Sequence, residues 1–177
     1  MAATVQLRKL TGVNSSITST NVTAGSARLG TSDEATSASS IPVPTSGSNY
    51  SYWATLQLNC TVAPDNSLTN IFFYTDGTNS FGTGVDGIVI PASGYASAVG
   101  TAGTSGSLLS AANYTGSACA ATSPMFIYTS ACKLTLTGST TTTGSFGNRA
   151  VVQLNVLSTA VAGNSGEDAV TFAWDES

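Results

Sequence analysis

Apolar and polar residues alternate with a period of two along several stretches, and the longest of these begins at Tyr50. One face of that stretch is aromatic or apolar, with one cysteine: Tyr50, Tyr52, Ala54, Leu56, Leu58, Cys60 and Val62. The positions between them are polar, except for Trp53. Because successive side chains of a strand point to opposite faces, this pattern predicts a long strand with one buried face, on which Cys60 is a small core residue.

Shorter stretches of the same kind predict further strands. They lie at residues 4–10, 71–75, 85–90, 125–129, 132–136, 150–157 and 170–174. Clusters of glycine, serine, asparagine and proline separate them, and Asp76-Gly77 predicts a hairpin turn. No stretch of 11 residues has the 3.6-residue apolar period of a helix. We therefore predict an all-β fold, an antiparallel β-sandwich of jelly-roll or Greek-key type, formed by residues 1–177 as a single domain.

Two segments have no strand pattern. Residues 31–48 are polar and contain Pro42 and Pro44, and residues 91–116 are rich in glycine, alanine and serine. Loops of this length are uncommon in a compact domain unless they have a function. We predict irregular loops or arms, which either become ordered against a neighbouring subunit or run over the surface of the domain.

The composition excludes two classes of function. Charged residues make up 8% of the chain, whereas serine and threonine supply 53 of its 177 residues. There is no histidine, the net charge is -4 at pH 7, and no stretch is basic. Binding of nucleic acid through its phosphates and catalysis through an imidazole are therefore excluded. No apolar run is long enough to span a bilayer, so we expect neither a nucleic acid nor a membrane as partner.

The first residues and the cysteines bear on the compartment. The sequence turns polar within nine residues and lacks the apolar core of a secretory signal, so we expect synthesis and folding in the cytoplasm, with reduced thiols. Three cysteines cannot all pair within one chain. Cys119 and Cys132 flank a 12-residue segment and could form a disulfide, and the sequence leaves this open.

One loop carries weak candidates for a metal site. Asp76, Asn79 and Asp86 lie in a single glycine-rich stretch, and Ca²⁺ favours such oxygen donors. Their spacing is not that of an EF-hand, and a plain turn is the alternative interpretation. We expect no bound metal and no cofactor.

Other residues that could carry catalysis are poorly arranged for it. The acidic pairs at 167–168 and 175–176 flank the last strand, and adjacent residues of a strand point to opposite faces, so neither pair makes a glycosidase site. The stretch Gly163-Asn164-Ser165-Gly166 is similar to the serine motif of chymotrypsin-type proteases, which need a histidine that this chain lacks. We expect that the protein is not an enzyme.

Trp53 is the one aromatic residue on the polar face of its strand. It could form a subunit interface, pack beneath the segment that contains Pro42 and Pro44, or serve as a stacking platform for a ligand. We favour packing or an interface. A carbohydrate-binding module would instead require an exposed Trp53 or Tyr95 on a groove.

The stretch NYSYW at residues 49–53, followed by IFFYTDGTNSFGTG at residues 71–84, resembles small virion proteins of tailed bacteriophages. In these, an aromatic strand precedes a Tyr-Thr-Asp-Gly hairpin, and the resemblance covers about residues 49–86. Phage head-decoration (cement) proteins of this kind are β-sandwiches or β-tulips that sit on the capsid, often as trimers. The resemblance implies a virion protein, made in the host cytoplasm, that clamps neighbouring major capsid proteins as a homotrimer.

The resemblance also implies a clamp, for which residues 1–12, as an N-terminal arm, or residues 31–48 are the candidates. The candidate interface residues are Val5, Leu7, Trp53, Pro42 and Pro44. Two alternatives stay open. The first is a virion protein of the tail, neck or fibre, and the second is a carbohydrate-binding or adhesion module.

Overall fold

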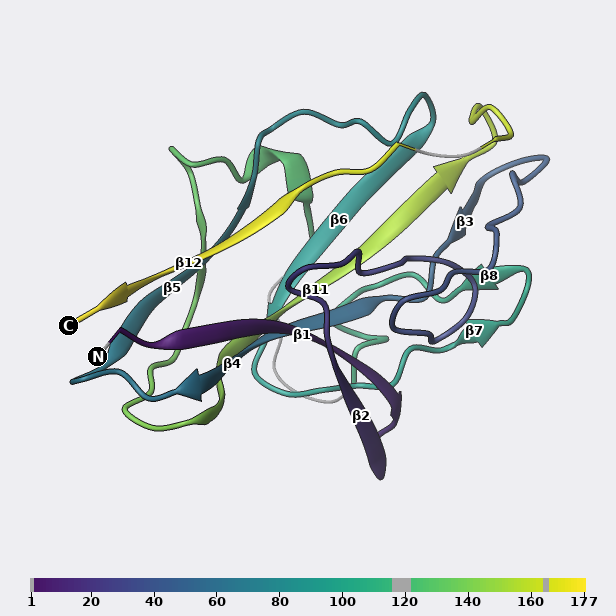
Figure 1. The fold of residues 1–177 in the computed structure, drawn as a ribbon. Coiled ribbons are helices and arrows are strands. Elements are labelled where there is room, and N and C mark those ends of the chain that lie inside the picture. The colour runs from purple at the N-terminus through teal and green to yellow at the C-terminus, as the bar shows by residue number, and fades with distance from the viewer. Residues whose placement is uncertain (1, 116–121, 164–165) are drawn as a thin grey trace.

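The computed structural model describes residues 2–115, 122–163 and 166–177, which form a sandwich of two antiparallel sheets (Figure 1). The larger sheet has the order β2-β1-β4-β11-β6-β9, with β3 also paired to β11, and the smaller has the order β10-β5-β12. The larger consists of β1 (Thr4–Val13), β2 (Ser16–Asn21), β3 (Ser48–Tyr50), β4 (Ala54–Val62), β6 (Val85–Ala92), β9 (Ser123–Pro124) and β11 (Gly144–Leu157). The smaller consists of β5 (Leu68–Thr75), β10 (Leu134–Leu136) and β12 (Val170–Glu176). The predicted all-β sandwich is confirmed.

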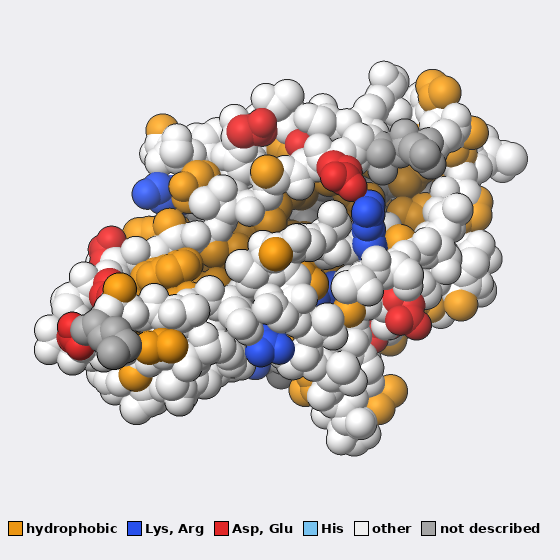
Figure 2. Space-filling view, in the orientation of Figure 1, with side chains coloured by type: hydrophobic (Ala, Val, Ile, Leu, Met, Phe, Trp, Pro, Cys, Tyr) orange, Lys and Arg blue, Asp and Glu red, His pale blue; other side chains and the backbone are white. Residues whose placement is uncertain are grey.

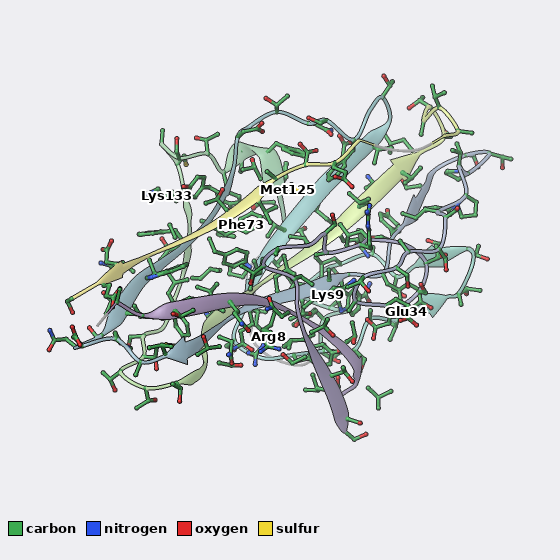
Figure 3. All side chains as sticks on the ribbon, viewed as in Figure 1. Arg8, Lys9, Glu34, Phe73, Met125 and Lys133 are labelled. Atoms are coloured by element: carbon green, nitrogen blue, oxygen red, sulfur yellow. The ribbon has the colours of Figure 1, made fainter. Side chains whose placement is uncertain are left out.

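The inner faces of the two sheets share one core. Leu56, Leu58 and Cys60 of β4 face Ile71 and Phe73 of β5, and all five are at most 3% exposed. Figure 3 shows Phe73 pointing into the space between the sheets. The core position predicted for Cys60 is confirmed, because the alternation along β4 places it beside Leu58. The prediction for Val62 is wrong, since β4 ends beyond the core and leaves this side chain 37% exposed.

A second apolar cluster covers the outer face of the larger sheet. Trp53, Ile90 and Val151 pack there against Leu109 and Tyr114 from the segment that follows β6. This segment contains a two-stranded hairpin of β7 (Gly100–Thr101) and β8 (Ser105–Gly106), so part of the loop predicted over residues 91–116 is regular; residue 116 itself lies outside the described residues. Trp53 is only 2% exposed. Thr55 and Gln57, which lie on the same face within β4, are 1% and 6% exposed, so β4 is buried on both faces although its sequence alternates.

Gln153 holds this covering segment in place. Its side chain is fully buried, and its Nε2 donates to the carbonyl oxygens of Ser51 and Ser107, at 2.7 and 2.8 Å. Its Oε1 accepts from the N–H of Leu109, at 2.7 Å. A buried amide is stable only when its donors and acceptors are paired, and here one side chain connects β11 both to the covering segment and to the chain between β3 and β4.

The predicted hairpin at Asp76-Gly77 is wrong. β5 pairs with β10 and β12, whereas β6 pairs with β11 and β9, so the two strands belong to different sheets. The turn itself forms: the Asp76 carboxylate accepts from the N–H of Thr78 at 2.8 Å, and Gly77 has a φ of 87°, which glycine tolerates best. The signal for the turn is local, and it does not specify which strand becomes the neighbour.

Two further predictions need correction. Residues 125–129 do not form a strand, because a short 3-10 helix, η1 (Met125–Ile127), follows Pro124 and buries Met125 while Ile127 stays 54% exposed. β2 has no apolar alternation and was not predicted; it forms because its backbone pairs with β1 from Arg8 to Val13. In the part of the chain that the structure describes, no helix is long and apolar enough to cross a membrane.

The first strand is an integral part of the larger sheet. β1 pairs with β4 along Thr4–Leu10 and with β2 along Arg8–Val13, so the prediction of an N-terminal arm over residues 1–12 is wrong for the described residues 2–12. The strand is thus held in the sheet by β4 from Thr4 onward and by both neighbours along Arg8–Leu10. Residues 31–47, in contrast, contain no strand, as predicted, and run irregularly to the start of β3.

Candidate functional site

The loop that carries the metal candidates is closed by its own hydrogen bonds. Asn79 Nδ2 donates to the carbonyl oxygen of Val85 at 2.8 Å and to Asp86 Oδ1 at 3.3 Å. The structure therefore brings Asn79 and Asp86 together, but it turns the donor group of the amide toward the carboxylate, whereas Ca²⁺ requires converging oxygens. The carboxylate of Asp76 accepts a hydrogen bond from the N–H of Thr78 within its own turn. Among the described residues, no group of three or more histidine, cysteine and acidic side chains could hold a metal ion.

The acidic side chains around β12 are bound to separate partners. Glu167 forms an ion pair with Arg28 at 3.0 Å, and Asp168 Oδ2 accepts from the N–H of Ser80 at 3.0 Å. At the other end, Asp175 Oδ2 accepts from Asn70 Nδ2 at 2.7 Å. These carboxylates anchor the ends of the strand and do not converge on a substrate site. The serine motif at residues 163–166 includes residues 164 and 165, which lie outside the described part of the chain.

Neither of the two aromatic residues proposed as a glycan platform is a fully exposed side chain. Trp53 is buried, and its Nε1 donates to the carbonyl oxygen of Ala96 at 3.0 Å. The favoured packing of Trp53 is therefore found, but beneath the segment after β6 and not beneath Pro42 and Pro44, and the buried ring is not exposed for a subunit interface or a ligand platform. Tyr95 is half-buried, and its hydroxyl donates to the carbonyl oxygen of Gly12 at 2.6 Å.

Two other aromatic rings lie on β5 beside Lys133. The ammonium of Lys133 is 5.1 Å from the ring centroid of Phe72 and 5.6 Å from that of Tyr74. Cation–π contacts of this kind stabilise an exposed sheet face. Because the ammonium lies over both rings, it competes with a sugar for the faces on which the sugar would stack.

The candidate interface residues lie in different places. Pro42 is exposed and Pro44 half-buried in the irregular segment before β3, where the carbonyl oxygen of Pro42 accepts from Asn49 Nδ2 at 2.8 Å. Val5 and Leu7 are half-buried on β1 and pack against the inner core. Val5 and Leu7 therefore lie where the two sheets separate, and they line a groove there.

This groove, called here the β1–β12 groove, consists of two adjoining hollows of about 390 and 270 Å³ that share Leu7, Thr23 and Val170. Figure 2 shows apolar side chains along a hollow on this face, between the positions that β1 and β12 occupy in Figure 1. The smaller hollow is lined by Val5, Leu7, Thr23, Leu58, Val170, Thr171, Phe172 and Trp174. The groove therefore reaches the inner core at Leu58.

Two polar contacts lie near the ends of β12. Near the chain termini, the N–H of Ala3 donates to Glu176 Oε1 at 2.7 Å, and at the other end Arg28 pairs with Glu167. Between these contacts, within the described part of the chain, no strand pairs with the outer edge of β12, which ends the smaller sheet. On the other side, β2 begins to pair with β1 only at Arg8, so residues 4–7 have one strand neighbour, β4.

A second accessible surface is the hairpin formed by β1 and β2, called here the hairpin surface. Val13 and Ile17 are 59% and 47% exposed near its turn, and Figure 1 shows β2 projecting from the body of the sandwich. β2 ends the larger sheet and carries the sequence SITSTN, without charge or proline. It thus combines an unpaired backbone edge with two exposed apolar side chains.

A buried polar cluster holds the loop after β2 against β1. Lys9 is 3% exposed, and its ammonium donates to the carbonyl oxygens of Arg28 and Glu34, each at 2.5 Å. Figure 3 shows Lys9 on β1 and Glu34 on the neighbouring segment. Burial lowers the pKa of Lys9 to about 8, against the opposing effect of Asp33 and Glu34. Asp33 Oδ2 accepts from the N–H of Gly12 at 2.6 Å, and burial raises its pKa.

The sequence did contain a signal for this cluster. Val5, Leu7 and Lys9 are alternate residues of one strand and therefore share a face, so the lysine stands on an apolar face. A charge at such a position is either at the edge of the core or paired within it. The two neighbouring acids, Asp33 and Glu34, lie in an otherwise uncharged segment and are the partners to expect.

Comparison with family models, with curated proteins and with solved structures finds no match to this chain. Its function is therefore argued from its own residues.

Proposed function

We propose that the protein is a structural component of a tailed-phage virion, a capsid decoration (cement) protein that binds across the joints between major capsid proteins. The observation that carries this proposal is the hairpin surface, with its uncharged strand edge and its exposed Val13 and Ile17. The resemblance of residues 49–86 to small phage virion proteins supports the same conclusion. The hairpin surface takes the role expected of an N-terminal arm.

The edge of β2 is suited to contact with another protein. Natural sheets usually protect an edge strand with charge, proline or a bulge, because its unpaired N–H and C=O groups pair readily with other chains. β2 has no charge or proline, and its register with β1 from Arg8 to Val13 is unbroken. A strand added by a neighbouring protein would form hydrogen bonds with the N–H and C=O groups along this edge. The same contact would bury the side chains of Val13 and Ile17.

The proposed protein acts as a homotrimer without enzymatic activity. Each copy contributes a modest contact with the capsid, and three linked contacts detach only when all of them break, which raises the overall affinity. A surface rich in hydroxyl groups and poor in charge is suited to such packing between proteins. The partner is the major capsid protein or another virion protein, and the mature location is the virion.

Location can be tested by immunogold electron microscopy of purified particles with an antibody against this chain. Gold distributed over the heads is the expected result. Gold restricted to tails or necks would move the protein to the tail, neck or fibre and contradict decoration. Particles without gold would contradict the virion proposal as a whole and favour the adhesion module.

Contact through the hairpin can be tested by adding variant protein back to particles that lack it. Val13→Lys with Ile17→Lys should reduce binding at least tenfold, because charge is placed on two side chains that the capsid would bury. The matched control is Val161→Lys, at a side chain that is 81% exposed and outside the hairpin. Equal binding by both variants would contradict the role of the hairpin surface.

A further inference from the structure

The geometry points to a second contact: the β1–β12 groove binds an extended segment of a partner protein, which adds to β12 as a fourth strand of the smaller sheet. The segment has apolar residues at every second position and basic residues at its ends. This inference rests on the proposed function in so far as the protein acts by contact with other proteins. It concerns a surface separate from the hairpin.

The floor of the groove belongs to the sandwich core. Leu58, which is 3% exposed, lies beneath half-buried Val5, Leu7, Phe172 and Trp174. The rings of Phe73 and Phe172 contact each other edge to face, with their centroids 5.6 Å apart, so the inner face of β12 is continuous with the core. Over the described residues, the smaller sheet has three strands and the larger has seven. One further strand beside β12 would cover these side chains.

The backbone around the groove favours a polypeptide over an acyl chain. β12 pairs with β5 in regular register from Val170 to Ala173, and its other edge has no strand neighbour among the described residues. Its N–H and C=O groups along that edge can be satisfied by an extended chain, whereas a hydrocarbon would leave them without protein partners. The alternation of side chains along a strand gives the period of two in the segment, because only every second residue faces the floor.

The acidic residues around the groove favour basic residues at the ends of the bound segment. Four of the nine acidic residues of the chain lie near the ends of β12: Glu167 and Asp168 precede the strand, and Asp175 and Glu176 are its last two residues. Arg28 is the basic side chain paired with Glu167. Complementary charges in a partner accelerate its binding and fix its register. Lysine or arginine at the ends of the segment would meet these acids.

The inference can be tested in solution with a blocked synthetic peptide, KTVTVTVTK, and the full chain. Trp174 lines the groove, whereas Trp53 is buried on the outer face of the other sheet, so tryptophan emission reports on the groove through Trp174. We expect saturable binding with a blue shift in emission, and slower amide exchange at residues 170–173. Trp174→Phe should abolish the shift, and amide exchange provides a readout that does not depend on this variant.

Two control peptides separate pattern from charge. KTTVVVTTK has the same composition without the alternation, and ETVTVTVTE keeps the alternation with acidic ends. Both should bind at least tenfold more weakly at low ionic strength. In the protein, Val170→Thr should weaken binding severalfold because it makes the groove more polar, whereas Val161→Thr is the matched exposed control and should not.

Several results would overturn the inference. These are equal binding of the alternating and non-alternating peptides, binding without protection of the amides at 170–173, or no binding. A shift of Trp174 emission by dodecanoate but not by the peptide would identify the groove as an acyl site instead. Because the assay contains no particles, a protein that decorates heads but ignores the peptide contradicts this inference alone. A protein that binds the peptide but labels no heads contradicts decoration alone.

Discussion

The ammonium of Lys9 donates to the carbonyl oxygen of Glu34 at 2.5 Å, and this bond fixes the irregular segment after β2 to the inner side of β1. The same ammonium binds the carbonyl oxygen of Arg28, a residue that lines the larger hollow of the β1–β12 groove and pairs there with Glu167. One buried charge thus supports both the loop and the groove.

Stability should rise between pH 8 and pH 9. Burial lowers the pKa of Lys9 to about 8 from its ordinary 10.5, so between these values the unfolded chain binds more protons than the folded chain, and raising the pH favours the folded state. The expected gain in the free energy of unfolding is about 1 kcal/mol, measured by urea titration at each pH.

This pH dependence has a matched control. Lys9→Met should flatten it, because methionine fills a similar volume without a titratable group. Cys60 and Tyr95 have raised pKa values and oppose the gain as their unfolded forms ionise, so Cys60 offsets part of it below pH 9 and both oppose it more strongly at higher pH, where measurements should stop. A stability that falls from pH 8 to pH 9 would contradict the assignment to Lys9.

Deleting residues 1–10 should abolish cooperative unfolding. The deletion removes the β1 residues that pair with β4 and exposes β4 along one side; it also removes the buried side chains of Lys9 and Leu10. A domain with a typical stability of about 5–15 kcal/mol cannot lose so much of a central sheet. Thermal unfolding followed by circular dichroism measures the effect. A sharp transition at an unchanged temperature would restore the free-arm hypothesis.

Replacing Trp53 by alanine should destabilise the fold by about 3–5 kcal/mol. The side chain is 2% exposed, contacts Tyr114 with ring centroids 5.7 Å apart, and donates to Ala96. Denaturant unfolding checks this value, and Val161→Ala at an exposed position should change it little. A neutral effect of Trp53→Ala would show that the outer cluster contributes nothing.

A chelator should leave the melting temperature unchanged, and added Ca²⁺ should not raise it. The Asn79 amide already occupies Asp86 Oδ1, and Asp76 binds its own turn, so these three side chains present no converging set of free oxygens. A ligand that binds only the folded state raises its stability, so differential scanning fluorimetry with Ca²⁺ is a direct measurement. An increase of several degrees with Ca²⁺ would restore the metal site.

Period-two alternation predicted most of the long strands, because it depends on the local geometry of a strand. It failed where burial depends on tertiary cover: Trp53 faces a cluster that Leu109 and Tyr114 complete, and both come from the distant segment after β6. It also failed at Asp76-Gly77, since a turn signal does not name the neighbouring strand. β2 carries no apolar pattern and forms only through its pairing with β1.

The candidate site was harder to predict than the strands. Val5 and Leu7 were named from the sequence as interface residues, and both line the β1–β12 groove. The other wall comes from β12, near the opposite end of the chain, and no local pattern connects the two strands. For the cluster around Lys9, the lysine on an apolar face signalled a paired charge, but the groups that bind its ammonium are the backbone carbonyls of Arg28 and Glu34, which leave no mark on side-chain composition.

The hydrogen bond between Ala3 and Glu176 also brings the first and the last strand together near their outer ends. The start of β1 lies near the end of β12 (Figure 1), so a short glycine-rich linker could join the described residues at these ends without disturbing either sheet. New ends could then be opened within residues 35–40, which lie in the irregular segment between β2 and β3. A circular permutant of this kind would keep every strand pairing, and the chain would no longer end beside the groove.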